Sequence, residues 1–327
     1  MKKSRAAPPA FRAGPLSLEP EEPASSVYHV PVLAAQIATL AAGRSRAVDG
    51  TVGGGGHTAL LRDAGLLILA VDRDPDALAA ARSRLGDAHI TWLHGRFGAT
   101  ETLRAIQSFH PDFILLDLGV SSAQIDRDPR GFSFRPGVPL DMRMDPGAGE
   151  SGADLLNHLA ESELATLFFE YGDEPKSRRL ARSIVRRRGT RPFGVSDDLV
   201  NAIRETLGPR AGRPDFARLF QAIRIAVNDE LADLDRALPE LMESLPPAGI
   251  LAVISYHSGE DRLVKHRFQG WERSCICPPR QPVCSCRGRS LGKCMPRKPI
   301  VAEPAEREQN PRARSAKLRV FRKADGG

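Results

Sequence analysis

Short runs of consecutive apolar residues alternate along the chain with stretches in which apolar positions recur every three or four residues. Uninterrupted short runs are typical of buried β-strands, and the longer spacing is typical of amphipathic helices. The strand-like runs lie at 66–71, 89–93, 113–119 and 249–255, with a shorter one before position 49. Helical patterns such as 74–85 separate them. Strands that alternate with helices predict an α/β domain with a largely parallel sheet.

The pattern changes in the middle of the chain. Residues 125–153 are irregular but carry aromatic, methionine and charged side chains, which favours an ordered lid. Helical patterns without any strand signal follow at about 154–160, 161–171, 175–188 and 196–207. Ser196 is placed to cap the last of them. We therefore expect an all-helical insertion at 125–215, with a role in substrate recognition, inside a discontinuous α/β domain formed by 27–124 and 216–327.

Two further stretches complete this organisation. Residues 1–26 are rich in Pro, Ala and Glu, and this composition predicts a disordered tail. Apolar positions from Phe220 to Leu245 step by three and four, which predicts one long amphipathic helix that ends before Pro246. The last apolar run, at 317–321, has the pattern of an edge strand.

A glycine-rich loop follows the first strand and is the strongest sign of a ligand site. The segment passes from Asp49 through Gly50 to four consecutive glycines at 53–56, and a helical pattern begins directly after them. Strand, glycine loop and helix open a Rossmann-like unit, in which the backbone approaches a ligand closely and the helix N-terminus offers unpaired N–H groups. A plain packing unit with a glycine-rich turn is the alternative, but four glycines are more than a turn needs.

Three of the predicted strands end on a carboxylate, at Asp49, Asp72 and Asp117. Ligands of open α/β sheets bind beyond the carboxyl ends of the strands, so these three side chains are expected to line one crevice. Asp72 ends the second strand, where an acidic residue can accept the hydroxyls of a ribose. Phe97 follows the third strand and would either cover an adenine or pack in the core. The set predicts an adenosine-containing ligand.

The glycine spacing separates two cofactors of that kind. The dinucleotide fingerprint G-x-G-x-x-G fails in both registers, because Thr58 stands at the sixth position from Gly53 and Val52 at the third position from Gly50. S-adenosylmethionine contains no pyrophosphate and does not require this spacing. The residues therefore favour S-adenosylmethionine over NAD.

The composition of the chain indicates the kind of partner it binds and the compartment in which it works. The chain has 327 residues, a net charge of +7 and a pI of about 9.4, which favours a polyanionic partner such as RNA. Its five cysteines all lie between Cys275 and Cys294, which does not fit a secreted disulfide framework. The absence of a signal peptide or long apolar run in the sequence predicts a cytoplasmic protein that does not span a membrane. Nothing in the sequence indicates an obligate protein partner.

A cluster of cations lies in the predicted helical insertion. It contains no Asp or Glu, whereas Leu180 and Ile184 would face the core. Like charges four positions apart destabilise a helix, and arginine binds phosphate bidentately, so we expect RNA contacts here rather than a merely solvated face. The cations are Lys176, Arg178, Arg179, Arg182, Arg186, Arg187, Arg188 and Arg191.

The cysteines form two C-x-C pairs, Cys275/Cys277 and Cys284/Cys286, followed by Cys294. Paired cysteines in a compact basic segment can bind zinc. This spacing differs from the usual C-x₂-C, so a reduced, metal-free loop is the expectation and no metal site is assigned.

Taken together, the motifs closely resemble those of the bacterial 16S ribosomal RNA (cytosine-N4)-methyltransferase family. Distinctive examples are Asp72-Arg73-Asp74-Pro75 and Gly131-Phe132-Ser133-Phe134. The matching segments are 29–33, 49–51, 55–57, 72–75, 115–122, 131–134, 139–146, 220–225, 255–262 and 310–315. Two positions depart from the family pattern, Ala123 in place of proline and Tyr256 in place of phenylalanine, and neither removes a charged or hydrogen-bonding group.

The resemblance implies a Rossmann-like class I S-adenosylmethionine methyltransferase sheet, an α/β fold with an inserted all-helical domain. It also implies methylation of the N4 amine of a cytidine in the decoding centre of 16S rRNA, with the small ribosomal subunit as partner. Carried over by motif, the cofactor contacts are Gly55, Gly56, His57, Asp72, Phe97, Asp117 and Gln124.

Without the family resemblance, the residues leave more than one kind of methyl acceptor open. Methylation at carbon 5 of a pyrimidine needs a cysteine nucleophile, and none follows the fourth strand, so an amino, ring-nitrogen or hydroxyl acceptor remains. We expect Asp117 and His257 to line the acceptor pocket and to accept an amine hydrogen. Ser258 and Asp261 have capping-box spacing, whereas His257 needs no such role. An NAD-linked oxidoreductase and a non-enzymatic ribosomal RNA-binding module are the alternatives.

Overall fold

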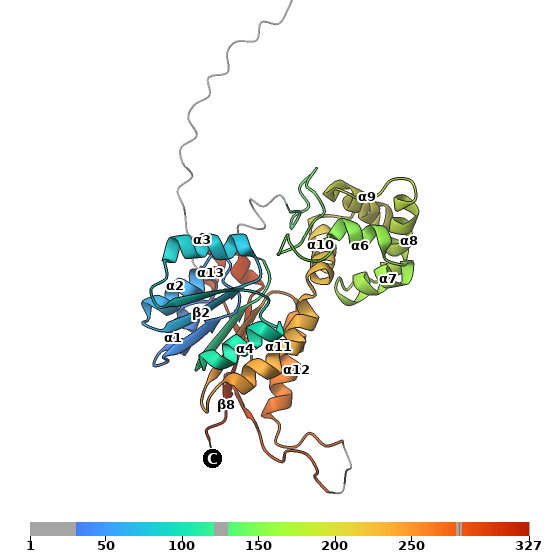
Figure 1. Ribbon diagram of the computed structural model, residues 1–327. Coiled ribbons are helices and arrows are strands. Elements are labelled where there is room, and N and C mark those ends of the chain that lie inside the picture. The colour runs from blue at the N-terminus through green and yellow to red at the C-terminus, as the bar shows by residue number, and fades with distance from the viewer. Residues whose placement is uncertain (1–30, 121–129, 279–280, 282, 327) are drawn as a thin grey trace, which may run out of the picture.

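A twisted sheet of eight strands forms the centre of the computed structural model, which describes residues 31–120, 130–278, 281 and 283–326 (Figure 1). The strand order is β3-β2-β1-β4-β5-β8-β6, with β7 also paired to β8. Strands β1 to β5 are parallel, and β8 runs antiparallel to β5, β6 and β7. The bounds are β1 Arg46–Asp49, β2 Leu67–Asp72, β3 Ile90–His94, β4 Phe113–Asp117, β5 Ile250–Ser255, β6 Gly292–Cys294, β7 Ile300–Val301 and β8 Lys317–Lys323. The expected α/β class is confirmed, and the tail expected at 1–26 lies outside the described residues.

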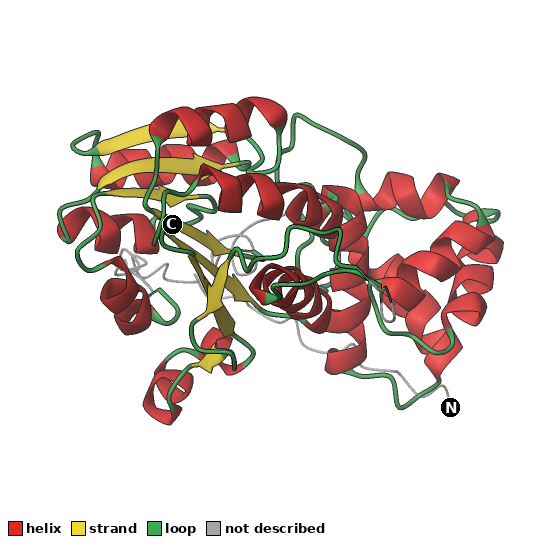
Figure 2. Cartoon of the chain, turned by 90° about the horizontal axis from the view of Figure 1, so that it is seen from below, coloured by secondary structure: helices red, strands yellow, loops and turns green. Residues whose placement is uncertain are grey.

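Helices cover both faces of the sheet (Figure 2), because alternate strand residues point to opposite sides and both sides are apolar. Ala47 and Phe113 face one hydrophobic cluster, and Val48 and Ile114 face the other. The first cluster is covered by α1 Ala34–Ala41, α2 Gly56–Asp63, α3 Pro75–Leu85 and the 3-10 turn Pro311–Arg314, which follows α13 Pro304–Gln309. The second is covered by α4 Thr100–Phe109, α11 Glu230–Ser244 and α12 Ser258–Glu272.

A third hydrophobic cluster lies among helices to one side of the sheet (Figure 1). These helices are α6 Gly152–His158, α7 Glu161–Glu170, α8 Ser177–Arg188, α9 Ser196–Leu207 and α10 Arg213–Asn228. Leu180 and Ile184 of α8 are fully buried in it, as their spacing predicts. Phe216 and Phe220 of α10 also belong to this cluster and pack against Phe134 with ring centroids 5.8 and 6.1 Å away. The helical core therefore continues past residue 215.

The single helix expected from Phe220 to Leu245 is wrong. The stretch forms two helices, α10 and α11, separated at Asp229, whose backbone is left-handed with φ of 52°. Apolar periodicity continues across the break because α10 packs in the helical cluster and α11 on the sheet. A pattern of burial does not reveal a change of packing partner, so the turn was not visible in the sequence.

Ser196 does not cap α9, contrary to the expectation. Val195 is the N-cap residue, and the Asp198 carboxylate accepts the N–H groups of Gly194 and Val195 at 2.9 and 3.0 Å. Ser196 is fully buried, and its hydroxyl donates to the carbonyl of Arg135. The capping group was therefore assigned one residue too late, and the hydroxyl instead fixes the preceding loop.

The described part of the irregular segment is tied to both parts of the molecule. Arg130 donates to the Asp74 carboxylate at 2.7 Å, at the start of α3. The Asn228 side chain, at the end of α10, accepts the N–H of Met144 at 2.9 Å and donates to the carbonyl of Met142 at 2.7 Å. Residues 130–146 thus form an ordered strap between the sheet and the helical cluster. None of the helices in the described ranges has the length and apolar character needed to cross a bilayer.

Candidate active site

The glycine loop joins the end of β1 to α2, next to the point where the strand order reverses between β1 and β4. Sheets of this kind bind ligands at such a switch point. Gly55 has φ of 75°, and a Cβ there would lie 2.9 Å from the Arg84 side chain and 3.0 Å from Ala81. A Cβ on Gly50 would lie 2.5 Å from Leu116. The loop therefore needs glycine both for its backbone conformation and for its close packing on β4 and α3.

Asp72 holds the loop through its carboxylate. One oxygen accepts the N–H of Gly53 at 2.7 Å, and the other accepts the N–H of Asp74 at 2.8 Å. Burial raises the pKa of Asp72 to about 6, although these two N–H groups act in the opposite direction. Each oxygen keeps a second lone pair, so the carboxylate can still accept a pair of vicinal hydroxyls. Its position at the end of β2 fits the expected ribose site.

His57, the second residue of α2, lies between a backbone carbonyl and a carboxylate. Its Nε2 is 2.9 Å from the carbonyl oxygen of Val32, and its Nδ1 is 3.4 Å from Asp117 Oδ2. Both neighbours are acceptors, so both ring nitrogens carry protons in the arrangement that satisfies them. Burial lowers the pKa of His57, but the hydrogen bond to Asp117 and the charges of Asp117 and Asp49 outweigh it and the pKa is raised. An imidazolium here compensates buried negative charge.

Asp49 and Asp117 are held in different ways. Asp49 is fully buried and accepts the hydroxyl of Thr58 at 2.6 Å, and burial raises its pKa. Asp117 is partly exposed and accepts the Tyr256 hydroxyl at 2.8 Å, while its own N–H donates to the Thr51 hydroxyl at 2.6 Å. Burial and the Asp117 carboxylate raise the pKa of Tyr256 well above its ordinary value, so the phenol stays neutral and donates. Asp117 therefore faces the crevice with both oxygens already oriented.

His257 has the capping role that the sequence assigned to Ser258, so that expectation is wrong. His257 is the N-cap residue of α12, and its Nδ1 accepts the N–H of Glu260 at 3.4 Å. Its Nε2 is 3.0 Å from Glu260 Oε1 but makes no hydrogen bond with any of the described residues, and Glu260 Oε2 accepts the N–H of Tyr256 at 2.9 Å. Ser258 instead donates to Asp173 at 3.2 Å, in the loop between α7 and α8. The imidazole of His257 is thus engaged with its own helix.

The remaining expected cofactor contacts lie around the loop, except one. Gly56 begins α2 and lies against Pro31, since a Cβ at this position would be 3.1 Å from that ring. Phe97 is half-buried and lies beside Gly50, so it is partly a core residue and partly accessible. Gln124 lies outside the described residues. The sheet therefore brings together the glycines, His57, Asp72, Phe97 and Asp117.

Two residues of this site were not assigned a role from the sequence. Tyr256 was noted only as a departure from a family pattern, and its hydroxyl proves to orient Asp117. Thr58 had no assigned role, and its hydroxyl donates to Asp49 nine positions earlier, which was expected to line the crevice but is fully buried. A buried carboxylate needs hydrogen-bond donors, so the threonine near the helix start was the available signal.

In the folded chain, several cations of α8 form ion pairs with carboxylates, contrary to the argument from the sequence. Arg186 and Arg187 both bind the Glu205 carboxylate of α9, with Arg187 Nε at 2.7 Å. Arg182 is 3.5 Å from Glu161 of α7. The carboxylates come from neighbouring helices, and a search for Asp or Glu within the same segment could not find them.

Arg188 has a structural role, because its Nη1 donates to the carbonyls of Leu156 and Leu159 at 2.9 and 2.7 Å, at the end of α6. At the other end of α8, Lys176, Arg178 and Arg179 are exposed, and no carboxylate in the described ranges forms an ion pair with them. Seven of the eight cations therefore divide into an engaged C-terminal group and an accessible N-terminal group, and the eighth, Arg191, is exposed beyond the end of α8.

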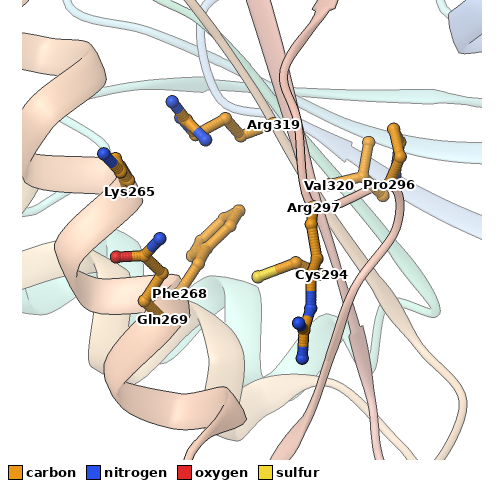
Figure 3. A pocket seen from close by; sticks show the side chains of 8 residues that line it. All are labelled: Lys265, Phe268, Gln269, Cys294, Pro296, Arg297, Arg319 and Val320. Atoms are coloured by element: carbon orange, nitrogen blue, oxygen red, sulfur yellow. The ribbon is translucent and has the colours of Figure 1, made fainter.

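A small cavity lies elsewhere in the molecule, between α12 and the strands β6 and β8 (Figure 3). Its volume is about 10 Å³, and Phe268, Cys294 and Arg319 are among the residues that line it. That is room for about one water molecule, so it is not a cofactor site. A shallower hollow of about 310 Å³ lies at the start of α8, next to Lys176 and Arg210.

Comparison with known proteins matches nearly the whole chain. The model of the MraW methylase family matches residues 26–324. A protein of Gemmatimonas aurantiaca named "Ribosomal RNA small subunit methyltransferase H" is 54% identical over 92% of this chain and 96% of that protein. A protein of Rubrobacter xylanophilus with the same name is 44% identical over 92% of this chain and 98% of that protein.

Proposed function

We propose that this chain, which belongs to the MraW methylase family, methylates the N4 amine of a cytidine in the decoding centre of 16S ribosomal RNA. Family membership makes it an S-adenosylmethionine-dependent methyltransferase. An RNA substrate in the small ribosomal subunit agrees with the names of the relatives and with the positive charge of the chain. Such a substrate would place the reaction in the cytoplasm.

The observation that carries the proposal is the arrangement at the carboxyl ends of β1, β2 and β4, where the glycine loop, Asp72 and Asp117 come together. Asp72 would hold the ribose of the cofactor, and the glycine loop would face its methionine part. These residues fit the cofactor, because Asp72 presents free lone pairs beside a backbone that lacks Cβ atoms. When bound, S-adenosylmethionine supplies an electrophilic methyl group on a sulfonium.

The acceptor must meet that methyl in line, and the chain has to position it. With cofactor and acceptor held this way, the amine nitrogen would take the methyl group, the electron pair of the carbon–sulfur bond would stay on sulfur, and the amine proton would pass to solvent. Asp117 lies where it can accept an amine hydrogen bond and localise the nitrogen lone pair. Its two oxygens are oriented by Tyr256 and His57, which favours a positioning role over free proton exchange.

The decisive experiment is incubation of the full chain with methyl-labelled cofactor and small ribosomal subunits that lack the modification, followed by nucleoside analysis. Label in N4-methylcytidine at one position supports the proposal. Label in another nucleoside would contradict the acceptor assignment, and label in no RNA would contradict the substrate.

His257 is a predicted catalytic residue that also caps a helix, and these two roles can be separated. His257→Asn keeps a good N-cap but removes the imidazole, whereas His257→Ala removes both. If the imidazole acts on the amine, single-turnover rates at saturating cofactor fall in both variants. If capping alone matters, the Asn variant keeps the parental rate.

We also propose that residues 125–215, together with α10, form the RNA-recognition part of the enzyme. The supporting feature is the accessible group at the start of α8, formed by Lys176, Arg178 and Arg179. Phosphate contacts of this kind position an RNA without reading its bases, so the target cytidine is selected at the crevice. The strap 130–146 connects the two parts and is anchored at Asp74, next to Asp72.

A further inference from the structure

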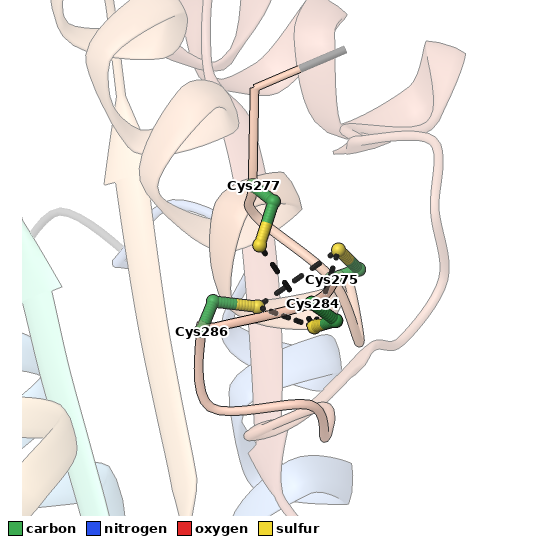
Figure 4. Close-up of side chains that lie close together, drawn as sticks. All are labelled: Cys275, Cys277, Cys284 and Cys286. Carbon is green, nitrogen blue, oxygen red and sulfur yellow. Dashed lines mark hydrogen bonds between the residues drawn. The ribbon is translucent and has the colours of Figure 1, made fainter. Parts of the chain in front are cut away.

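Four of the five cysteines meet at one place, in the segment that follows α12. The two C-x-C pairs lie on opposite arms of a loop, and the loop brings their sulfurs together (Figure 4). The four Sγ atoms all lie within 4.8 Å of one another. Cys284 Sγ is 3.8 Å from Cys275 Sγ, 3.8 Å from Cys277 Sγ and 3.5 Å from Cys286 Sγ. Cys286 Sγ is 3.9 Å from Cys275 Sγ.

These distances match one coordination geometry. Four thiolates bound tetrahedrally at about 2.3 Å from a zinc ion lie about 3.8 Å from one another. Disulfide sulfurs are bonded at about 2.05 Å, so the observed 3.5–3.9 Å separations are not those of disulfides. In a [4Fe–4S] cluster each thiolate binds a different iron, and in a [2Fe–2S] cluster two thiolates bind each iron, so four thiolates on either cluster lie further apart than four thiolates on one shared ion.

The segment around the four cysteines also needs an interaction that holds it in one conformation. None of the described residues between 273 and 290 is buried, and the described part of this loop has no helix or strand. Ile276 and Val283 are 52% and 74% exposed, so the segment has no apolar core of its own. A segment this long without secondary structure or core is ordered by some other interaction. A metal ion provides it, because binding energy at such a site is folding energy.

The loop is also joined to the rest of the molecule next to the cluster. Arg287, one residue after Cys286, donates to the carbonyls of Gly270 and Arg273 at 2.6 and 2.7 Å, at the C-terminal end of α12. The N–H of Ile276 is directed at Cys286 Sγ at 3.3 Å, the kind of hydrogen bond that supports a ligating thiolate.

We propose that Cys275, Cys277, Cys284 and Cys286 bind one zinc ion, which fixes the loop 273–290 on the end of α12. All four positions are taken by protein ligands, so the site is structural and offers no open coordination position for catalysis. The spacing argument against zinc applies to a single C-x-C pair, whereas here two pairs on opposite arms complete the tetrahedron.

The chain provides its own control. Cys294 lies in β6 beside the small cavity at α12 and is not part of the cluster (Figure 3). We expect the full-length protein, purified under reducing conditions without chelator, to contain about one zinc per chain by plasma mass spectrometry. Cys294→Ser keeps that stoichiometry, and Cys284→Ser loses it.

Cobalt substitution examines the geometry in the parent chain, independently of how well any variant folds. Co²⁺ in a four-thiolate tetrahedron gives intense thiolate-to-metal charge-transfer bands and visible d–d bands. Appearance of these bands at one equivalent, and their displacement by one equivalent of zinc, supports the site. Absence of bound metal under reducing conditions, iron in place of zinc, or equal zinc in Cys284→Ser and the parent would each overturn it.

Removal of the ion has a local consequence. Trypsin cleavage after Arg289, which is exposed in the loop, is expected to accelerate by about tenfold or more when zinc is stripped, because the local opening free energy falls. Cofactor affinity, determined at the sheet edge, is expected to stay within about twofold. Unchanged cleavage of the stripped protein would contradict the ordering role.

Discussion

The crevice and helix α8 are both rich in charge, and they differ in where the compensating groups come from. At the strand ends around the glycine loop, carboxylates are satisfied mainly by N–H and hydroxyl groups from segments that meet at that edge of the sheet: the β1–α2 connection, the start of α2, and the residues after β2 and β5. On α8, arginines are satisfied by carboxylates and carbonyls from α6, α7 and α9. In the first region the strand order brings the partners together, whereas in the second the neighbouring helices decide which cations remain available.

The largest effect is expected from Asp72→Ala. The variant removes the charged acceptor for the ribose and releases the N–H groups of Gly53 and Asp74. Loss of a hydrogen bond to a charged group costs about 1.5–3 kcal/mol, which corresponds to an increase of roughly tenfold or more in the cofactor Kd. Calorimetric titration measures this Kd. Asp76→Ala, at the exposed start of α3, is the matched control. Equal affinities in the two variants would falsify the ribose assignment.

Next in size is the pH dependence of cofactor binding. Burial raises the pKa of Asp72 to about 6, and the charged form is the one that accepts two hydroxyls. A group with this pKa is about nine-tenths protonated at pH 5, so affinity is expected to fall roughly tenfold between pH 7.5 and 5. Asp72→Asn should remove most of this dependence.

The same carboxylate affects folding in the opposite direction. Because its pKa is higher in the folded chain than the ordinary value of 3.8, the folded state binds the proton more tightly. Its contribution to the free energy of unfolding therefore decreases as the pH rises from about 4 to about 6. Denaturant unfolding of the parent and of Asp72→Asn over this window separates the folding effect from the binding effect.

A smaller effect is expected from the accessible end of α8. Lys176→Gln, Arg178→Gln and Arg179→Gln made together should weaken RNA binding and flatten the log–log salt dependence by ~0.7–0.9 for each phosphate that the helix no longer neutralises. Arg186→Gln with Arg187→Gln, whose side chains are paired with Glu205, should change the slope less. If the second set changes the slope more than the first, the division of α8 into paired and accessible groups does not govern RNA binding.

The smallest effect concerns the paired end of α8. Arg187→Gln breaks a partly exposed ion pair with Glu205, and such pairs contribute about 0–1 kcal/mol. Its Tm is expected to fall by no more than about 3 °C, whereas Arg188→Gln leaves two helix-terminal carbonyls without their donor and should destabilise more. Thermal unfolding followed by circular dichroism compares the two, and the reverse order would contradict the structural role of Arg188.

The sequence predicted the sheet strands well, and the carboxylates at their ends lie at one edge of the sheet, because strand ends in a parallel sheet meet there whatever the helices do. Asp72 and Asp117 are examples of positions that follow from order alone. The sequence prediction failed where a side chain or a stretch of backbone contacts a part of the chain that is distant in sequence. Asp229 breaks a continuous apolar pattern, His257 takes the cap that Ser258 was expected to provide, and Glu205 neutralises arginines about twenty positions earlier. The break at Asp229 and the pairing of Glu205 depend on which helices become neighbours, which apolar periodicity alone does not determine. His257 caps its own helix, while Ser258 instead bonds Asp173, 85 positions earlier.

Asn228 gives the helical part a modular character. Its side chain binds Met142 and Met144 at the incoming strap, and its own position ends α10, the outgoing connection. The points at which the chain enters and leaves the helical part therefore lie side by side, as they do in domains that tolerate insertion. The helical part could be exchanged for that of a relative, or replaced by a linker of a few residues, without changing the order of strands in the sheet. A graft of this kind tests the proposed RNA-recognition role, because RNA affinity is then expected to follow the grafted helices while cofactor affinity stays with the sheet.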